Sequence, residues 1–195
     1  MILDLIRQSL GQGEMDQIGR QLGARPEQTQ QAIAAALPLL LGALGRNSSQ
    51  PRGAASLADA VARDHDGSIL DDLSGFLGQG NTSPGDAILK HVLGSRRQTV
   101  ERGLGQVSGL QGQSASTLLS LLAPIVMGAL GKARSSSSLD SGGLSRLVQK
   151  EASSSAPSGQ LGSLLSLLDS DHDGQVSDDI ARIGSQLLGG FFGKK

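Results

Sequence analysis

Three aspartates late in the chain have the spacing of a calcium-binding loop. Asp169, Asp171 and Asp173 alternate within "DSDHDGQVSDDI" (169–180), and Gly174 follows them. Carboxylates at loop positions 1, 3 and 5 supply the oxygen ligands that calcium prefers, and a glycine at position 6 allows the sharp turn. The backbone carbonyl of Gln175 would be the ligand at position 7. Calcium is therefore the one candidate cofactor that the sequence offers.

The closing position is the weak point of this loop. A bidentate glutamate is expected at position 12, where Ile180 stands, so Asp178 or Asp179 would have to close a variant loop. An alternative needs no metal: Ser177 caps a helix whose first turn holds the two aspartates, and the earlier aspartates form Asx turns. Both interpretations remain open. The proposed metal ligands are Asp169, Asp171, Asp173, Gln175, Asp178 and Asp179.

A similar acidic phrase, "DHDGSILDDL", occupies residues 64–73. It fits calcium less well, because alignment places an alanine at position 1 and leaves Asp64 and Asp66 alone. His65 and His172 occupy matching places in the two phrases, and histidines beside aspartates are typical of transition-metal sites. Each phrase supplies only one imidazole, so we expect exposed loop histidines that bind no metal. His91 has no partner in the sequence and suggests no chemistry.

The two phrases belong to a longer internal repeat. "LPLLLGALGR" (37–46) matches "APIVMGALGK" (123–132), so that Pro38 aligns with Pro124, 86 positions further along. The acidic phrases lie further apart, which requires an insertion of about 21 residues in the second copy. Serine-rich stretches at 134–143 and 152–160 supply it, and they are polar enough to be loop or linker. We predict copies at 1–87 and 88–193, with a Ser/Gly-rich insertion around 134–160, joined in one integrated globular unit.

Apolar periodicity predicts helices throughout, and no window alternates long enough to predict a strand. The fold class is therefore all-α, a compact helical array of two multi-helix subdomains. The two most apolar runs, 32–45 and 118–131, are shorter than the roughly 18–20 residues that cross a bilayer, so we expect buried core helices. The expected helices are 2–11, 14–22, 26–45, 53–63, 69–78, 85–94, 96–107, 114–132, 141–151, 160–168 and 177–190.

Four motifs together resemble the YidB-like family of bacterial proteins, a family of unknown function. They are "ALPLLLGALGRN", "DHDGSILDDL", "APIVMGALG" and "LLSLLDSDHDGQVSDDI", and they span nearly the whole chain. The resemblance implies a compact all-helical fold with internal duplication. It carries over no catalytic residues.

The sequence favours neither an enzyme nor a nucleic-acid-binding protein. It has no cysteine and only three histidines, and it lacks the phosphate-loop, nucleophile-elbow and zinc-protease motifs. Residues 18–33 resemble a helix-turn-helix, but the second helix offers no Lys or Arg before Arg46. Arg96, Arg97 and Arg102 are interpreted as a solvated face. With 18 acidic and 17 basic residues the net charge is −1, so we expect no nucleic-acid partner.

We therefore expect a non-enzymatic interaction or self-association module. The C-terminal "LLGGFFGKK" (187–195) motivates self-association, because it carries Phe191 and Phe192. The alternatives are a calcium-responsive module using 169–180 and DNA binding through 18–33. The N-terminus lacks the basic start of a secretory signal, so we expect a cytoplasmic protein with no membrane span. No small-molecule substrate is identified.

Overall fold

The structure is a computed structural model that describes residues 1–155, and every regular element in this range is helical. The all-α prediction is confirmed. In chain order the elements are α1 (Ile2–Ser9), α2 (Gln12–Leu22), α3 (Pro26–Asn47), α4 (Pro51–Asp64), the 3-10 helix η1 (Ser68–Leu70), α5 (Leu73–Gly78), α6 (Ser83–Leu93), the 3-10 helix η2 (Gly94–Arg96), α7 (Arg97–Ser108), α8 (Ser114–Ser137) and α9 (Ser141–Ser154).

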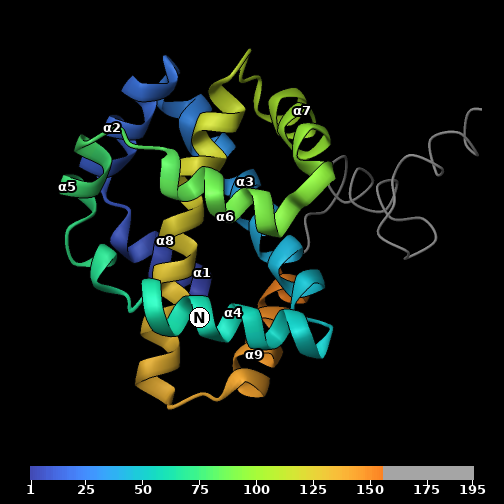
Figure 1. The fold of residues 1–195 in the computed structure, drawn as a ribbon. Coiled ribbons are helices and arrows are strands. Elements are labelled where there is room, and N and C mark those ends of the chain that lie inside the picture. Colours follow the sequence, from blue (N-terminus) through green and yellow to red (C-terminus); the bar gives the residue numbers. More distant parts are fainter. Residues whose placement is uncertain (156–195) are drawn as a thin grey trace, which may run out of the picture. The chain divides into compact units, whose positions relative to one another are not determined.

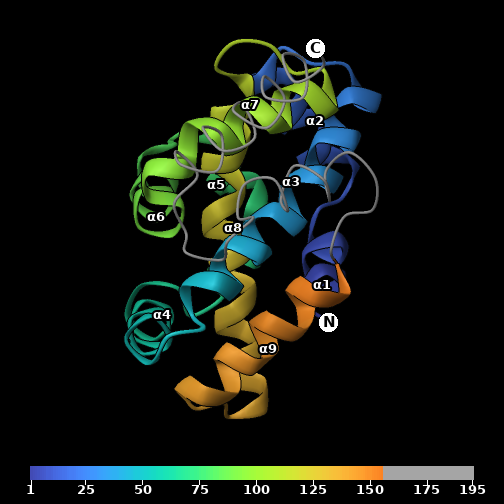
Figure 2. The same cartoon turned by 90° about the vertical axis from the view of Figure 1, so that its right-hand side faces the viewer.

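Helix α8 is the centre of the described unit. Every residue from 118 to 131 is buried, and α1, α2, α3, α4, α6 and α7 all contact this helix. Figure 1 shows α6 and α4 crossing in front of α8, and Figure 2 shows α1 on the opposite side of α8 from them. By length and composition α8 could also span a bilayer, with a mean hydropathy of 1.6 over 18 residues, but 83% of that window is covered by the protein itself.

Helix α3 is the second core helix, and it packs against α8, α7 and α9. Its apolar run 37–45 is mostly buried, as is the run 123–131 in α8, which confirms the expected burial of both. Pro38 and Pro124 lie inside these two helices. A helix that is apolar on all sides is stable in water only when neighbours cover it, so the remaining helices surround these two.

Helix ends agree with the predicted ranges to within a few residues, except in two places. The predicted helix 69–78 is divided into η1 and α5, because Asp72 caps α5 by accepting a hydrogen bond from the Gly75 amide at 2.9 Å. The prediction that 134–143 is a loop is wrong for most of its residues, since α8 continues to Ser137 and α9 begins at Ser141. The predicted helices 160–168 and 177–190 lie outside the described residues.

Side-chain hydrogen bonds explain how a serine-rich stretch stays helical. The Ser136 hydroxyl donates to the Lys132 carbonyl at 2.7 Å, four residues earlier in α8. Such a bond satisfies the hydroxyl within the helix. Asp140 then caps α9 by accepting from the Gly143 amide at 2.6 Å. The predicted linker is thereby reduced to a short turn between two helices.

Several repeated sequence features adopt the same local backbone geometry. Gly23 and Gly109, which are 86 positions apart, follow α2 and α7 with φ of 61° and 70°. One turn earlier, a Cβ added to Gly19 would lie 3.4 Å from the Ala24 carbonyl oxygen, and a Cβ added to Gly105 would lie 3.0 Å from that of Leu110. Helices α2 and α7 therefore each end at a glycine in the left-handed conformation. The residue after that glycine then lies over a second glycine, one turn earlier in the helix.

The segment after α4 lies directly on α8. A Cβ on Gly131 would overlap the His65 carbonyl, and a Cβ on Gly128 would overlap the Ile69 side chain. Gly67 has a φ of 104°, which L side chains rarely adopt, and it turns the chain at this contact. The small residues of the "GALG" motif in α8 thus allow the 65–69 segment to approach the helix backbone.

Gly131→Ala should therefore destabilise the protein strongly. The added methyl group cannot fit without moving the 65–69 segment, and overpacking of this kind costs about 2–3 kcal/mol. Gly13→Ala in α2 is the control, because nothing described lies within 4 Å of the added Cβ. Urea unfolding of the two variants measures the difference. An equal midpoint for Gly131→Ala and Gly13→Ala would show that this contact is not tight in solution.

Candidate functional site

A cavity of about 630 Å³ lies between α4 and α6. Its floor comes from the two core helices, where Leu44 of α3 and Met127 of α8 are buried. Its walls are Leu57 and Ala60 of α4 and Ile88 and Val92 of α6. Polar and charged side chains border it as well: Asn47, Asp59, Arg63, Asp64, His65 and His91. The cavity therefore has an aliphatic interior and a polar edge.

The two wall helices run in opposite directions across α8 (Figure 1). The C-terminal end of α4, with His65 directly after it, therefore lies beside Pro84 at the start of α6. His91, near the end of α6, lies beside the earlier part of α4 and near Asn47, whose side-chain amide donates to the His91 carbonyl at 3.1 Å. The two imidazoles consequently border opposite ends of the cavity.

A tight contact fixes the start of α6. A Cβ on Gly85 would overlap the Ser120 carbonyl, so the first turn of α6 lies against the backbone of α8. Leu89 and Leu93 are buried, whereas Ile88 and Val92 are only half-buried. Helix α6 thus has one face in the core and an adjacent apolar edge along the cavity.

A half-buried polar network holds α6 to α7 and α8. The Arg97 guanidinium donates to Asp86 at 2.5 Å and to Glu101 at 2.6 Å. Ser116 donates to Glu101 at 2.8 Å, and Ser120 donates to Asp86 at 2.8 Å. Burial alone would raise the pKa of Asp86, but the bonds from Arg97 and Ser120 outweigh it and leave that pKa lowered.

The network corrects one sequence interpretation. The sequence predicts that Arg97 belongs with Arg96 and Arg102 to a solvated face, yet its side chain is only 26% exposed and bridges two acidic residues. The sequence feature that indicates these ion pairs is the presence of the acidic residues Asp86 and Glu101. Only the fold brings Asp86 to the same place, because it lies on a different helix.

His65 is the polar group at the α4 end of the cavity. Its side chain is half-buried, which corrects the expectation of an exposed loop histidine. Burial lowers the pKa of His65 below the ordinary value of 6.5, and the neighbouring Asp64 carboxylate opposes this shift only in part. The imidazole is therefore neutral at pH 7, and a neutral imidazole can both donate and accept a hydrogen bond.

Three of the four aspartates of residues 64–73 have structural roles. Asp66 accepts hydrogen bonds from the amide and the hydroxyl of Ser68, at 2.9 and 2.7 Å. Asp72 caps α5, and Asp71 pairs with Lys132 at 3.0 Å. Within residues 1–155 no three metal-ligand side chains lie together. Capping and turn formation therefore account for the first acidic phrase.

Two other predicted sites have different outcomes. The calcium ligands Asp169, Asp171, Asp173, Gln175, Asp178 and Asp179 lie outside the described residues. The segment 18–33 does form two helices joined at Gly23, as predicted. Of its glutamines, Gln28 already donates to the Gly109 carbonyl at 2.6 Å, a contact within the protein.

The fold and the cavity define a class of protein: an all-helical body built around two buried helices, with an aliphatic cavity beside them. A family model described as "Bacterial protein of unknown function (DUF937)" matches residues 4–133. The chain therefore belongs to this family. No curated protein and no solved structure is detectably similar to it.

Arg97→Met should destabilise the α6 wall. The variant keeps an apolar stem but leaves Asp86 and Glu101 without their cation, and unsatisfied groups of this kind cost about 1–3 kcal/mol. Arg102→Met is the control, because Arg102 is exposed and its one bond within residues 1–155 is to its own helix, at the Gln98 carbonyl. Urea unfolding compares them. Equal losses of stability in the two variants would assign the network no stabilising role.

The pKa shift of His65 predicts a pH dependence of stability. Because the folded-state pKa lies below 6.5, the unfolded chain takes up the proton first, and stability falls as the pH drops below about 6.5. We expect the thermal midpoint to fall between pH 7.5 and 5.5 by more in the native protein than in His65→Gln. An NMR titration of the His65 ring protons gives the pKa directly. A value at or above 6.5 would contradict the prediction.

Proposed function

We propose that this protein is a non-enzymatic binding protein that takes a small apolar ligand into the cavity between α4 and α6. The cavity carries the proposal. Its volume of about 630 Å³ falls within the roughly 300–1,000 Å³ of small-molecule sites, which are mostly apolar with a few placed polar groups. The cavity has this composition, with Leu44 and Met127 beneath it and histidines at its two ends.

A small molecule suits this site better than a protein partner does. A standard protein interface takes about 800 Å² from each partner and has an apolar centre. Among the described residues Met1 is the only large apolar side chain that is exposed, at 56%. The aliphatic surface available to a ligand is thus mostly recessed in the cavity. Self-association through 187–195 is a separate proposal, because those residues lie outside the described part.

The placement of the titratable groups favours binding over catalysis. General acid–base chemistry needs two groups within hydrogen-bond reach of the reacting atoms. The two imidazoles border opposite ends of the cavity, and His91 already directs its Nδ1 at the Ala87 carbonyl, 2.9 Å away. Calcium response through 169–180 and DNA binding through 18–33 are the alternatives to this proposal.

We also propose that the two halves of the chain arose by duplication. The order of α2, α3 and α4 repeats as α7, α8 and α9, and the glycines after α2 and α7 share the left-handed conformation. In this pairing α1 corresponds to α6, and α9 corresponds to α4. The Glu151 side chain ties α9 to α1 by accepting from the Ile2 and Leu3 amides at 3.0 and 3.3 Å. The corresponding pair, α4 and α6, has the cavity between its two helices. The two copies therefore differ at the place where the ligand is proposed to bind.

Filling the cavity should abolish binding. Ala60 is half-buried and lines the cavity, whereas Ala62 on the same helix is exposed and does not line it, so Ala60→Trp and Ala62→Trp are a matched pair. We expect the uncharged fluorescent reporter N-phenyl-1-naphthylamine to bind the native protein and Ala62→Trp saturably, with one site. Its affinity for Ala60→Trp should fall at least tenfold.

Circular dichroism of both tryptophan variants controls for folding, and Ala60→Leu provides a smaller obstruction if Ala60→Trp unfolds. The native chain has no tryptophan or tyrosine, so its own fluorescence does not obscure the reporter. Equal reporter affinity in Ala60→Trp, Ala60→Leu and the native protein would exclude the cavity as the binding site.

A further inference from the structure

We infer that the ligand of the α4–α6 cavity is a single-chain aliphatic compound of about ten carbons with an uncharged, hydrogen-bonding end group placed at His65, as in a fatty alcohol. This inference rests on the proposed function and names the class of ligand for that site. Three properties of the cavity support it: the kind of side chain that lines it, its length, and the chemistry of its ends.

The lining favours an aliphatic chain over a flat ring. The apolar lining residues are aliphatic, and apart from the two imidazoles no aromatic ring borders the cavity within residues 1–155. The side chain of Met127 in the floor is unbranched and adapts to irregular shapes. Aromatic ligands gain most from offset or edge-to-face contact with aromatic side chains, which this lining does not offer.

The length of the cavity sets the length of the chain. Along α4 the lining extends from Ser56 to Asp64, and at a rise of about 1.5 Å per residue this stretch is about 12 Å long. Bonds of about 1.5 Å at tetrahedral angles advance an extended chain by about 1.25 Å per carbon. About ten carbons therefore match the length of the cavity along α4. A helix, with a diameter of about 10–12 Å, could place no more than about one turn in a space of this volume.

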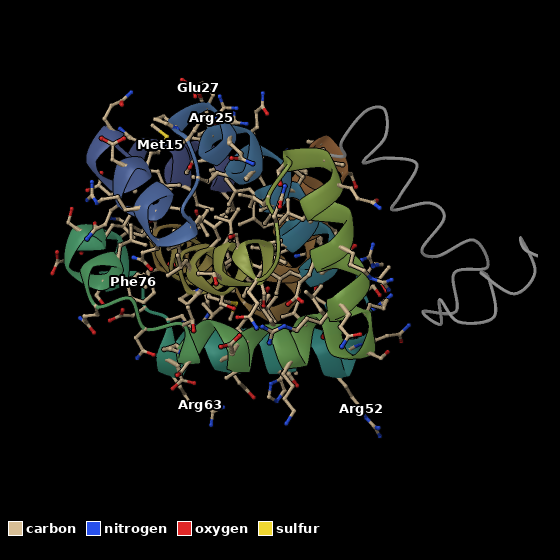
Figure 3. The ribbon with its side chains drawn as sticks, turned by 90° about the horizontal axis from the view of Figure 1, so that it is seen from above. Met15, Arg25, Glu27, Arg52, Arg63 and Phe76 are labelled. Atoms are coloured by element: carbon tan, nitrogen blue, oxygen red, sulfur yellow. The ribbon has the colours of Figure 1, made fainter. Side chains whose placement is uncertain are left out.

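The charges at the cavity edge disfavour an anionic end group. Among residues 1–155, Arg63 is the only Lys or Arg that lines the cavity, against the two carboxylates of Asp59 and Asp64. Figure 3 shows Arg63 extending from α4 away from the body, and its Nε is directed back at the Asp59 carbonyl, 3.4 Å away. A carboxylate or phosphate in the cavity would therefore lose its hydration without gaining a cation.

His65 offers what a hydroxyl group needs. The ring is half-buried at one end of the cavity, and neither of its nitrogens has a hydrogen-bond partner among residues 1–155. Its neutral form can accept a hydrogen bond from a hydroxyl group or donate one to it. At the other end, His91 Nδ1 is already directed at the Ala87 carbonyl, so His65 is the better site for the end group.

Three compounds with ten carbons separate the possibilities. In competition with the bound reporter, 1-decanol should bind at least tenfold more tightly than decanoate and at least tenfold more tightly than 1-naphthol. Affinity should rise from 1-hexanol to 1-decanol and then level off. His65→Ala should weaken 1-decanol several-fold and by more than it weakens the reporter, which has no hydroxyl group, and the His65 ring resonances should move when 1-decanol is added to the native protein.

The outcomes distinguish the ligand class from the site. If Ala60→Trp blocks the reporter but 1-naphthol or decanoate competes as well as 1-decanol, the site stands and the aliphatic, uncharged ligand class is wrong. If Ala60→Trp blocks the reporter but 1-decanol is insensitive to His65→Ala, the end-group assignment is wrong. If the reporter does not bind the native protein and calorimetry with 1-decanol shows no heat at its solubility limit, both proposals are overturned.

Discussion

Helix α8 has no side that meets water from residue 118 to residue 131, and the rest of the fold is arranged to cover it. An α-helix that is apolar all round must be enclosed, and enclosure requires neighbours that approach from every direction. Glycines make this approach possible on both partners: Gly85 of α6 meets the backbone at Ser120, and Gly131 meets the carbonyl of His65. Side chains at these positions would hold the covering segments away from α8.

The same constraint accounts for the cavity. Segment 65–69 and the start of α6 are both held directly against α8, and α4 and α6 lie side by side across α8 with the cavity between them (Figure 1). The space between α4 and α6 then has a floor of core residues, Leu44 and Met127, without a further helix above it. A gap lined by apolar side chains forfeits dispersion contacts, so the fold loses stability here that a bound aliphatic molecule would restore.

Several charged groups of the described unit hold helices in place. Arg97 of α7 joins α6 through Asp86 and α8 through Ser116, Lys132 pairs with Asp71, and Glu151 accepts from the first amides of α1. Net charge is close to zero, so no long-range field directs a charged partner to the surface. His65 differs from these groups, because it is half-buried at the cavity and has no partner among residues 1–155. It is a polar group at the cavity with hydrogen-bonding capacity left for a ligand.

The amino-acid sequence by itself determined the helical class, the burial of 37–45 and 123–131, and the turn at Gly23. These features follow from apolar periodicity and from the backbone freedom of glycine, both of which act over a few residues. The helix-capping interpretation of the acidic phrase was also available, because a cap joins residues three apart, as Asp72 and Gly75 show.

Only the tertiary structure decided the cavity, the role of Arg97 and the placement of His65 and His91. Leu44, Leu57, Ile88 and Met127 come from four helices, and none of them differs in sequence from an ordinary core residue. Whether such residues meet or leave a space depends on how far apart two helices are held, and contacts elsewhere in the chain set that distance. The serine-rich stretch departs from the prediction for a related reason: low helix propensity is a weak preference, and the helix that packing fixes over 118–131 continues into it, with the Ser136 hydroxyl bonded to the Lys132 carbonyl.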